Sequence, residues 1–250
     1  MLVLAHRGLP SVHCPENSAA AVAAAFDSGA DGVEIDLRLT FDGVLAVSHD
    51  LDLTRLTGSP AVVSTSRWEE LQDVAAASGV TLARFEDVLV IASGRRVVLE
   101  VKAPPPGPAA AARTSLALLA QLISLHGQGL PMDVTVSSFS PQVALSVRRL
   151  LPLTGLAVRT ALLGTPFDRP HALLRQALAA GHDEIHPHVL SLLAEPEAVS
   201  RAHALGVAVV PWTVNRHRAL RRCVRLGADA VITDCPAVAR SAIVATRAAA

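Results

Sequence analysis

The segment GVEIDL, residues 32–37, decides the fold that this sequence predicts. It is a short apolar run that carries two carboxylates, Glu34 and Asp36, two residues apart. In a β-strand this spacing places both side chains on one face. A helical segment, 18–28, precedes the run, and a strand that follows a helix in this way is typical of an α/β sheet.

The same alternation of short apolar runs and longer alanine- and leucine-rich segments continues outward to both ends of the chain. The predicted strands are 2–5, 32–37, 97–101, 134–137, 154–158, 184–185, 207–210 and 230–232. The predicted helices are 18–28, 85–92, 109–126, 141–150, 171–180, 196–205, 216–226 and 236–248. Eight strands alternating with eight helices predict a closed TIM-type (β/α)₈ barrel, with an open doubly wound sheet as the alternative.

One stretch, at about residues 50–80, interrupts this alternation. A short apolar run at 44–47 is followed by turn residues and by SRWEELQD, which predicts a capped helix that starts at Ser66. We interpret the stretch as a small insertion after the second strand of a single domain that spans residues 1–250. The PPPGP run at 104–108 predicts a stiff loop after the third strand, and Asn17 or Ser18 is expected to cap the first helix.

Composition excludes several classes of protein. With 22 Lys+Arg and 22 Asp+Glu, the formal net charge is zero, so we expect no nucleic-acid partner. The spacing of the three cysteines fits neither a disulfide framework nor a CxxC metal site. No apolar run reaches the roughly 18 residues of a membrane span, and the N-terminus lacks a secretion-signal pattern. We expect a cytoplasmic protein without stable membrane insertion, of unknown oligomeric state.

Polar residues lie in or shortly after the first three predicted strands, near the strand ends where an α/β barrel has its catalytic residues. They are His6, Arg7, Glu34, Asp36, His49, Glu100 and Lys102. Three carboxylates in an apolar barrel need a positive partner, and an all-oxygen ligand set favours Mg²⁺ or Ca²⁺, with Mn²⁺ possible, over Zn²⁺. Lys102 is the only lysine of the chain, which indicates a specific need for a compact ammonium there.

Nine short blocks, taken in order, resemble the signature blocks of the glycerophosphodiester phosphodiesterase family. They are HRG (6–8), PENS (15–18), EIDLRLT (34–40), DGV (42–44), SHD (48–50), EVK (100–102), SSFSP (137–141), WTVN (212–215) and GADAVITD (227–234). The resemblance spans the chain from His6 to Pro236. It implies a TIM-type barrel with a small insertion after the second strand. It also implies divalent-metal-dependent hydrolysis of small-molecule glycerophosphodiesters to glycerol 3-phosphate and an alcohol.

Carried over position by position, the resemblance implies roles for individual side chains. The implied metal ligands are Glu34, Asp36 and Glu100. The implied acid–base pair is His6 and His49. The implied phosphate contacts are Arg7 and Lys102, with Glu16 and Asn17 organising the site. The run VTLARFE (80–86) departs from the family's usual Pro-Thr-Leu-x-Glu pattern, which leaves the headgroup preference open.

A phosphodiester resists attack because its charge repels a nucleophile and its leaving alkoxide is very basic. We expect His6 to act as the base on the nucleophile, either water or the substrate's own glycerol hydroxyl, and His49 to protonate the leaving oxygen. Trp212 and Phe139, which follow predicted strands at the mouth of the barrel, are expected to pack against the glycerol.

Two other functions stay open at this point, a phosphate-ester-binding barrel without catalysis and a lipid-directed phosphodiesterase of the same fold. A different metal site is also open, because His186 and His188 have the spacing of a same-face pair that could bind Zn²⁺. We expect the ring of His186, at the end of the sixth strand, to border the pocket.

Overall fold

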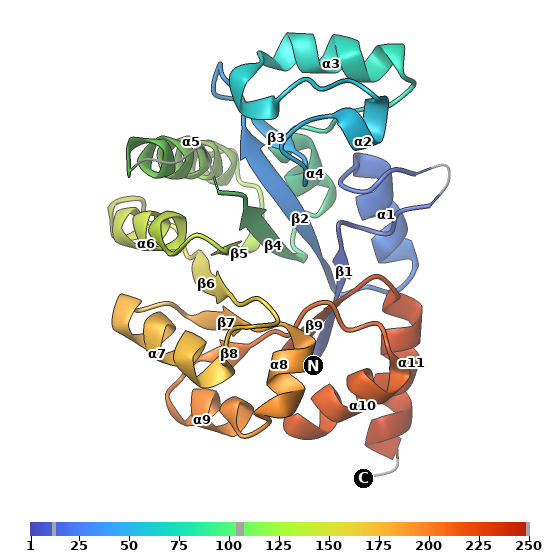
Figure 1. Cartoon of the computed structure of the whole chain (residues 1–250), viewed down its shortest axis with the longest axis vertical. Coiled ribbons are helices and arrows are strands. Elements are labelled where there is room, and N and C mark those ends of the chain that lie inside the picture. Colours follow the sequence, from blue (N-terminus) through green and yellow to red (C-terminus); the bar gives the residue numbers. More distant parts are fainter. Residues whose placement is uncertain (12–13, 104–107, 249–250) are drawn as a thin grey trace.

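The computed structural model describes residues 1–11, 14–103 and 108–248, in which eight parallel strands form a ring with helices outside it (Figure 1). In spatial order the strands run β8-β7-β6-β5-β4-β2-β1-β9. Their bounds are β1 Leu2–His6, β2 Gly32–Leu39, β4 Arg96–Val101, β5 Asp133–Ser138, β6 Arg159–Leu163, β7 Glu184–His186, β8 Ala208–Val209 and β9 Ala230–Thr233. Backbone N–H groups of Asp229 and Ile232 donate to the carbonyls of Val209 and Pro211, both at 3.0 Å, and bring the β8 and β9 segments together. The predicted barrel is confirmed in preference to the open sheet.

Helices cover the outer face of this ring (Figure 1). Their bounds are α1 Ala19–Asp27, α4 Phe85–Ile91, α5 Pro108–Gly127, α6 Pro141–Leu150, α7 Pro170–Ala180, α8 Val189–Ala194, α9 Ala198–Ala204, α10 His217–Leu226 and α11 Pro236–Ala248, with a 3₁₀ turn, η2, at Leu151–Leu153. Of the two predicted caps of the first helix, Ser18 is the one used, since its hydroxyl accepts the N–H of Ala21 at 3.1 Å.

The excursion after β2 consists of β3 Leu45–Val47, α2 Thr54–Thr57, the 3₁₀ turn η1 Val63–Thr65 and α3 Trp68–Ala77. It forms the cap at the top of Figure 1, beyond the end of β2. β3 pairs antiparallel with β2, and Leu53, Trp68 and Leu71 form a small core under α3. The helix begins at Trp68 rather than at Ser66, because the N–H of Arg67 donates to the Glu70 carboxylate at 2.9 Å.

The predicted strand 154–158 is wrong, because β6 begins at Arg159. The Thr154 hydroxyl donates to the Leu151 carbonyl at 2.7 Å, and Gly155 has a φ of 69°, so the chain turns here. The register with β5 then pairs Thr135 with Arg159. The apolar residues of 154–158 cover the core from this turn without joining the sheet.

Further differences from the predicted elements lie at α8, α9 and α5. Helix α8 was not predicted, and the helix predicted at 196–205 begins only at Ala198. Of the PPPGP run, residues 104–107 lie outside the described residues. Pro108 is the first residue of α5, where a missing N–H costs no hydrogen bond.

Successive residues of each strand point alternately outward, toward the helices, and inward, into the barrel. In β2, Val33, Ile35 and Leu37 belong to the large core shared with the outer helices. The alternate residues of β4 show how the interior is arranged along the strand. Arg96 forms ion pairs near the strand starts, Val98 packs with Leu4, Val210 and Ile232, and Glu100 lies near the strand end. The polar site therefore rests on an apolar layer.

Candidate active site

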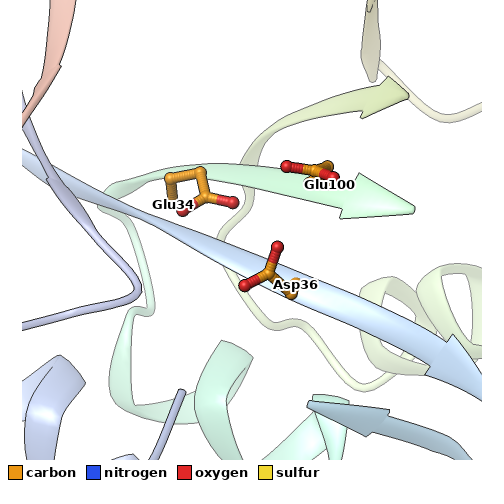
Figure 2. Close-up of side chains that lie close together, drawn as sticks. All are labelled: Glu34, Asp36 and Glu100. Carbon is orange, nitrogen blue, oxygen red and sulfur yellow. The ribbon is translucent and has the colours of Figure 1, made fainter. Parts of the chain in front are cut away.

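Three carboxylates lie side by side where β2 and β4 run toward their carboxyl ends. Glu34 and Asp36 come from β2, and Glu100 comes from β4, where it pairs in register with Asp36 (Figure 2). All three residues are buried, with exposed fractions of 3%, 1% and 8%. Each offers one oxygen to a set whose members lie within 4.8 Å of one another. This is the geometry of a candidate site for one hard cation.

Burial and the neighbouring charges shift the pKa values of all three carboxyl groups. Burial, and then the neighbouring charge of Asp36, raise the pKa of Glu34 to about 8. Burial also raises the pKa of Glu100. For Asp36, burial acts in the same direction, but the charges of Lys102 and Arg7 outweigh it and lower the pKa. Carboxyl groups that are costly to ionise together are stabilised by a divalent cation among them.

One oxygen of the cluster is left over. Within the described residues, Oε1 of Glu34 is buried and has no hydrogen-bond partner. An acceptor left in this state costs on the order of 1–3 kcal/mol. The residues present thus fit a divalent cation, because the set consists of oxygens only, is negatively charged and has a free ligand atom.

Two cations border the same cluster. Nζ of Lys102 lies 2.7 Å from Oδ1 of Asp36 and also contacts Oε1 of Glu100. Nε of Arg7 lies 3.4 Å from Oδ2 of Asp36, and the Arg7 backbone N–H donates to Oε2 of Glu34 at 3.1 Å. Lys102 and Arg7 therefore place positive charge at the rim of the carboxylate cluster.

Backbone conformation fixes Arg7 and Asn17 in this arrangement. Both residues have positive φ, at 57° and 58°, which few residues with a side chain adopt and which is often found at functional sites. The N–H of Asn17 donates to the Arg7 carbonyl at 2.9 Å. The Asn17 amide then clamps Asp36, donating to its carboxylate at 2.7 Å and accepting its N–H at 3.1 Å.

Gly8 allows the turn that follows β1. A Cβ atom there would lie 2.6 Å from the backbone carbon of Ala21, so no side chain fits between β1 and α1. The HRG block is therefore explained by packing at Gly8 as well as by the polar side chains before it.

Each predicted catalytic histidine has a carboxylate at Nδ1. Nδ1 of His6 lies 2.7 Å from Oδ1 of Asp234, and its Nε2 lies 3.9 Å from Oε2 of Glu34. Burial lowers the pKa of His6, but the hydrogen bond to Asp234 and the charge of Glu34 outweigh burial and raise it. Nδ1 of His49 lies 2.8 Å from Oδ1 of Asp50. Among the described residues, Nε2 of neither ring takes part in a hydrogen bond, so it is available for proton transfer.

The insertion reaches the site through Arg55, a residue of α2. Its Nε lies 2.6 Å from Oδ2 of Asp50, and its Nη2 lies 2.6 Å from Oε1 of Glu16. The same Glu16 oxygen accepts from Nη1 of Arg7 at 3.0 Å. A chain of alternating charges thus joins Arg7 to His49 through the insertion.

The site includes a pocket that is open to solvent. Its walls include His6, His49, Glu34, Glu100, Phe139 and Trp212. Trp212 packs edge-to-face on Phe139 with ring centroids 5.3 Å apart, and its Nε1 donates to the His186 carbonyl at 3.0 Å. The structure therefore brings the two predicted aromatic residues together on one wall of the pocket.

The histidine pair at 186 and 188 does not form a second metal site. Nε2 of His186 contacts Glu184 at 3.0 Å inside the barrel, and Nδ1 of His188 accepts the N–H of Leu190 at 3.2 Å, capping α8. The only three-member group of metal-binding side chains in the described part of the chain is the carboxylate cluster. His186 does not line the pocket that we expected it to border.

Sequence reasoning assigned no role to four residues that contact the site, Asp50, Arg55, Asn215 and Asp234. Asp234 directly follows the last strand, so the strand-end rule would have identified it. Asn215 accepts the N–H of Asp234 at 2.9 Å, and its amide donates to the Asp234 carboxylate. Arg55 carries no signal, because nothing in the sequence places the insertion against the barrel.

Comparison with known proteins shows the family to which this chain belongs. The model of the glycerophosphoryl diester phosphodiesterase family matches residues 6–238. The chain belongs to this family. A glycerophosphodiester phosphodiesterase of Bacillus altitudinis is 31% identical over 247 residues, which cover 94% of each chain. The chain is therefore an enzyme that hydrolyses phosphodiesters, as the resemblance predicted.

Solved structures show the same fold. A glycerophosphodiester phosphodiesterase from Parabacteroides distasonis superposes with a TM-score of 0.82 at 25% identity, covering 99% of this chain and 98% of that one. An Oleispira antarctica phosphodiesterase in complex with the product sn-glycerol-3-phosphate has a TM-score of 0.77 at 24% identity, covering 97% of this chain and 96% of that one.

Among the helices of the described ranges, none is both long and apolar enough to span a membrane.

Proposed function

We propose that this enzyme hydrolyses glycerophosphodiesters to glycerol 3-phosphate and an alcohol with the help of one divalent cation. The ligands are Glu34, Asp36 and Glu100, and the ion is Mg²⁺ or Ca²⁺, with Mn²⁺ possible. The observation that carries the proposal is the group of three buried carboxylates within 4.8 Å, two of which, Glu34 and Glu100, line a pocket together with His6 and His49.

The chain's own cations address the charge of the substrate. Bound at the carboxylates, a divalent cation supplies positive charge to the phosphate oxygens. Arg7 and Lys102, which already lie against Asp36, add N–H donors at the rim of the pocket. Together these groups reduce the repulsion that a phosphodiester anion presents to a nucleophile.

The two histidines transfer the protons of the reaction. We assign His6 as the base that takes the proton of the nucleophile, either water or a hydroxyl of the substrate's glycerol. We assign His49 as the acid that gives a proton to the leaving oxygen. The carboxylates of Asp234 and Asp50, at 2.7 and 2.8 Å from the two Nδ1 atoms, orient the rings for these roles.

The uncharged wall of the pocket suits the glycerol half of the substrate. Trp212 and Phe139 present ring faces and edges there, and they carry no charge that would compete for the phosphate. The Oleispira antarctica relative binds sn-glycerol-3-phosphate, which is the product that we assign to this chain.

Release of glycerol 3-phosphate from glycerophosphocholine tests the proposal. We expect turnover with the purified enzyme and added Mg²⁺, and none with Glu100→Gln. Binding of glycerophosphocholine without release would indicate a phosphate-ester-binding barrel. Release of diacylglycerol or a phosphorylated headgroup from phospholipid vesicles, without activity on glycerophosphocholine, would indicate a lipid-directed enzyme.

A further inference from the structure

A second pocket opens next to the active site and shares Lys102 with it. The end of β2, the insertion and α5 contribute its walls. Three cations line it, Arg38, Lys102 and Arg113, together with the hydroxyl residues Thr40 and Ser64. None of the described residues that line it is a carboxylate. A pocket with this lining suits an anion with apolar parts.

The two arginines are held by backbone carbonyls, which leave their charge available. Arg38 donates from Nε and Nη2 to the carbonyl of His49 at 3.0 and 2.8 Å. Arg113 donates from Nη2 to the Phe41 carbonyl, and at 3.5 Å to that of Thr40. In the part of the chain that the structure describes, neither guanidinium forms an ion pair with a carboxylate. Carbonyl contacts orient a guanidinium without neutralising it.

The second pocket joins the active site on the side where the leaving group is expected. Lys102 lines both pockets, and Arg38 holds the backbone of His49, the residue that we assign as the acid. The uncharged wall of Trp212 and Phe139 belongs to the active-site pocket alone. A diester whose glycerol packs on that wall therefore extends its alcohol half past His49 toward Arg38 and Arg113.

From this placement, and resting on the proposed function, we infer that the second pocket is a subsite for the alcohol half of the substrate and selects an alcohol that carries a negative charge. A second phosphate or a carboxylate has this chemistry, because both accept N–H donors from a guanidinium in pairs. A quaternary ammonium is repelled by the same two arginines. Arg113 is the specificity residue that can be tested most directly, since it is exposed and belongs to no other contact of the active site.

Two diesters that release the same product from opposite kinds of alcohol test the inference. Bis(glycerophospho)glycerol has an alcohol half with a second phosphate, and glycerophosphocholine has a cationic one. We expect the wild-type enzyme to have a higher kcat/KM on the anionic diester. In Arg113→Gln we expect the ratio of the two kcat/KM values to fall about 10-fold, the effect of one charge-assisted hydrogen bond. Arg113→Lys, which keeps the charge, should retain most of the ratio.

Two further variants keep the test independent of folding. Ser64→Asp adds a negative charge to the same pocket and should lower the ratio as well. Arg221→Gln, on the exposed face of α10, should leave it unchanged. A wild-type ratio near one, or a ratio that Arg113→Gln does not alter, would overturn the inference while leaving the proposed function intact. If the enzyme hydrolyses neither diester, both the inference and the proposed function are overturned.

Discussion

Nδ1 of His6 lies 2.7 Å from Oδ1 of Asp234, although 228 residues separate them in the sequence. The contact exists because β1 and β9 are neighbours in the ring, with Ala5 paired to Thr233. One of the two histidines that we propose as the acid–base pair is thus oriented by the residue that follows the last strand. Closure of the barrel is therefore a condition for the proposed chemistry as well as for stability.

Asp234→Asn should lower kcat, because the amide orients the His6 ring less firmly and stabilises its protonated form less. We expect a loss on the order of 10- to 10²-fold, a part of what acid–base catalysis contributes. Steady-state kinetics on glycerophosphocholine measure it. Asp229→Asn is the matched control, because Asp229 pairs with His203 at 2.9 Å outside the pocket. If kcat falls equally in both variants, Asp234 supports the structure and does not act specifically on His6.

His49→Ala should separate the roles of the two histidines. With a poor leaving group such as choline, we expect a rate loss on the order of 10² to 10⁴, and a much smaller loss with a p-nitrophenyl diester, whose oxygen leaves without a proton. His6→Ala should affect both substrates about equally, and His126→Ala, on an exposed position of α5, should affect neither. Selective recovery of His6→Ala on the aryl diester would reverse the assignment.

Arg55→Gln should reduce turnover although Arg55 does not line the active-site pocket. It removes the cation that joins Asp50 to Glu16, so His49 and Arg7 lose a shared support. We expect kcat to fall about 5-fold, as for one half-exposed ion-pair network. If kcat recovers in Arg55→Lys and does not change in Arg67→Gln of the same insertion, Arg55 acts by positioning His49 and Arg7. A Tm shift without a change in kcat would contradict it.

The ion pairs inside the barrel should appear in the pH dependence of stability. Burial alone would raise the pKa of Glu184, but its hydrogen bond to His186 and the charge of Arg96 lower it to about 2. A carboxyl group with a lowered pKa stabilises the folded state above the unfolded pKa, near 4.5, and this contribution is lost as the pH falls toward about 2. The stabilisation by the ionised Glu184 carboxylate above pH 5 is worth about 3 kcal/mol.

Urea unfolding of wild type and Glu184→Gln at several pH values measures this contribution. The difference in free energy of unfolding should be largest above pH 5 and should shrink as the pH approaches 2. Glu197→Gln, whose exposed carboxylate lies 3.6 Å from His171, is the control and should show little difference at any pH. A gap that stays constant down to pH 2 would contradict the lowered pKa.

The sequence predicted the parts of this protein that depend on periodicity and strand ends. Glu34 and Asp36 could be placed on one face because alternation along a strand is a local property. Glu100 and Lys102 could be added because parallel strands end at one edge of the barrel. The matching blocks completed the family assignment, since their order along the chain is itself information.

The parts that were missed depend on long-range packing. β6 starts at Arg159 because that residue pairs with Thr135 and contacts Glu184, whereas the more apolar run before it forms a turn. Arg55 joins the site only after the insertion has folded over β2. Arg38 and Arg113 line one pocket although they are 75 positions apart in the sequence. No pattern local to these residues indicates such contacts.

The central claim is that three buried carboxylates bind a cation needed for hydrolysis. The most direct measurement is glycerol 3-phosphate release from glycerophosphocholine by EDTA-dialysed enzyme, before and after metal is added. We expect no turnover after dialysis, and recovery with Mg²⁺, Mn²⁺ or Ca²⁺ more readily than with Zn²⁺. In Glu34→Gln, metal should restore little activity and should no longer raise Tm. Full turnover by the dialysed wild-type enzyme, or recovery with Zn²⁺ alone, would contradict the account.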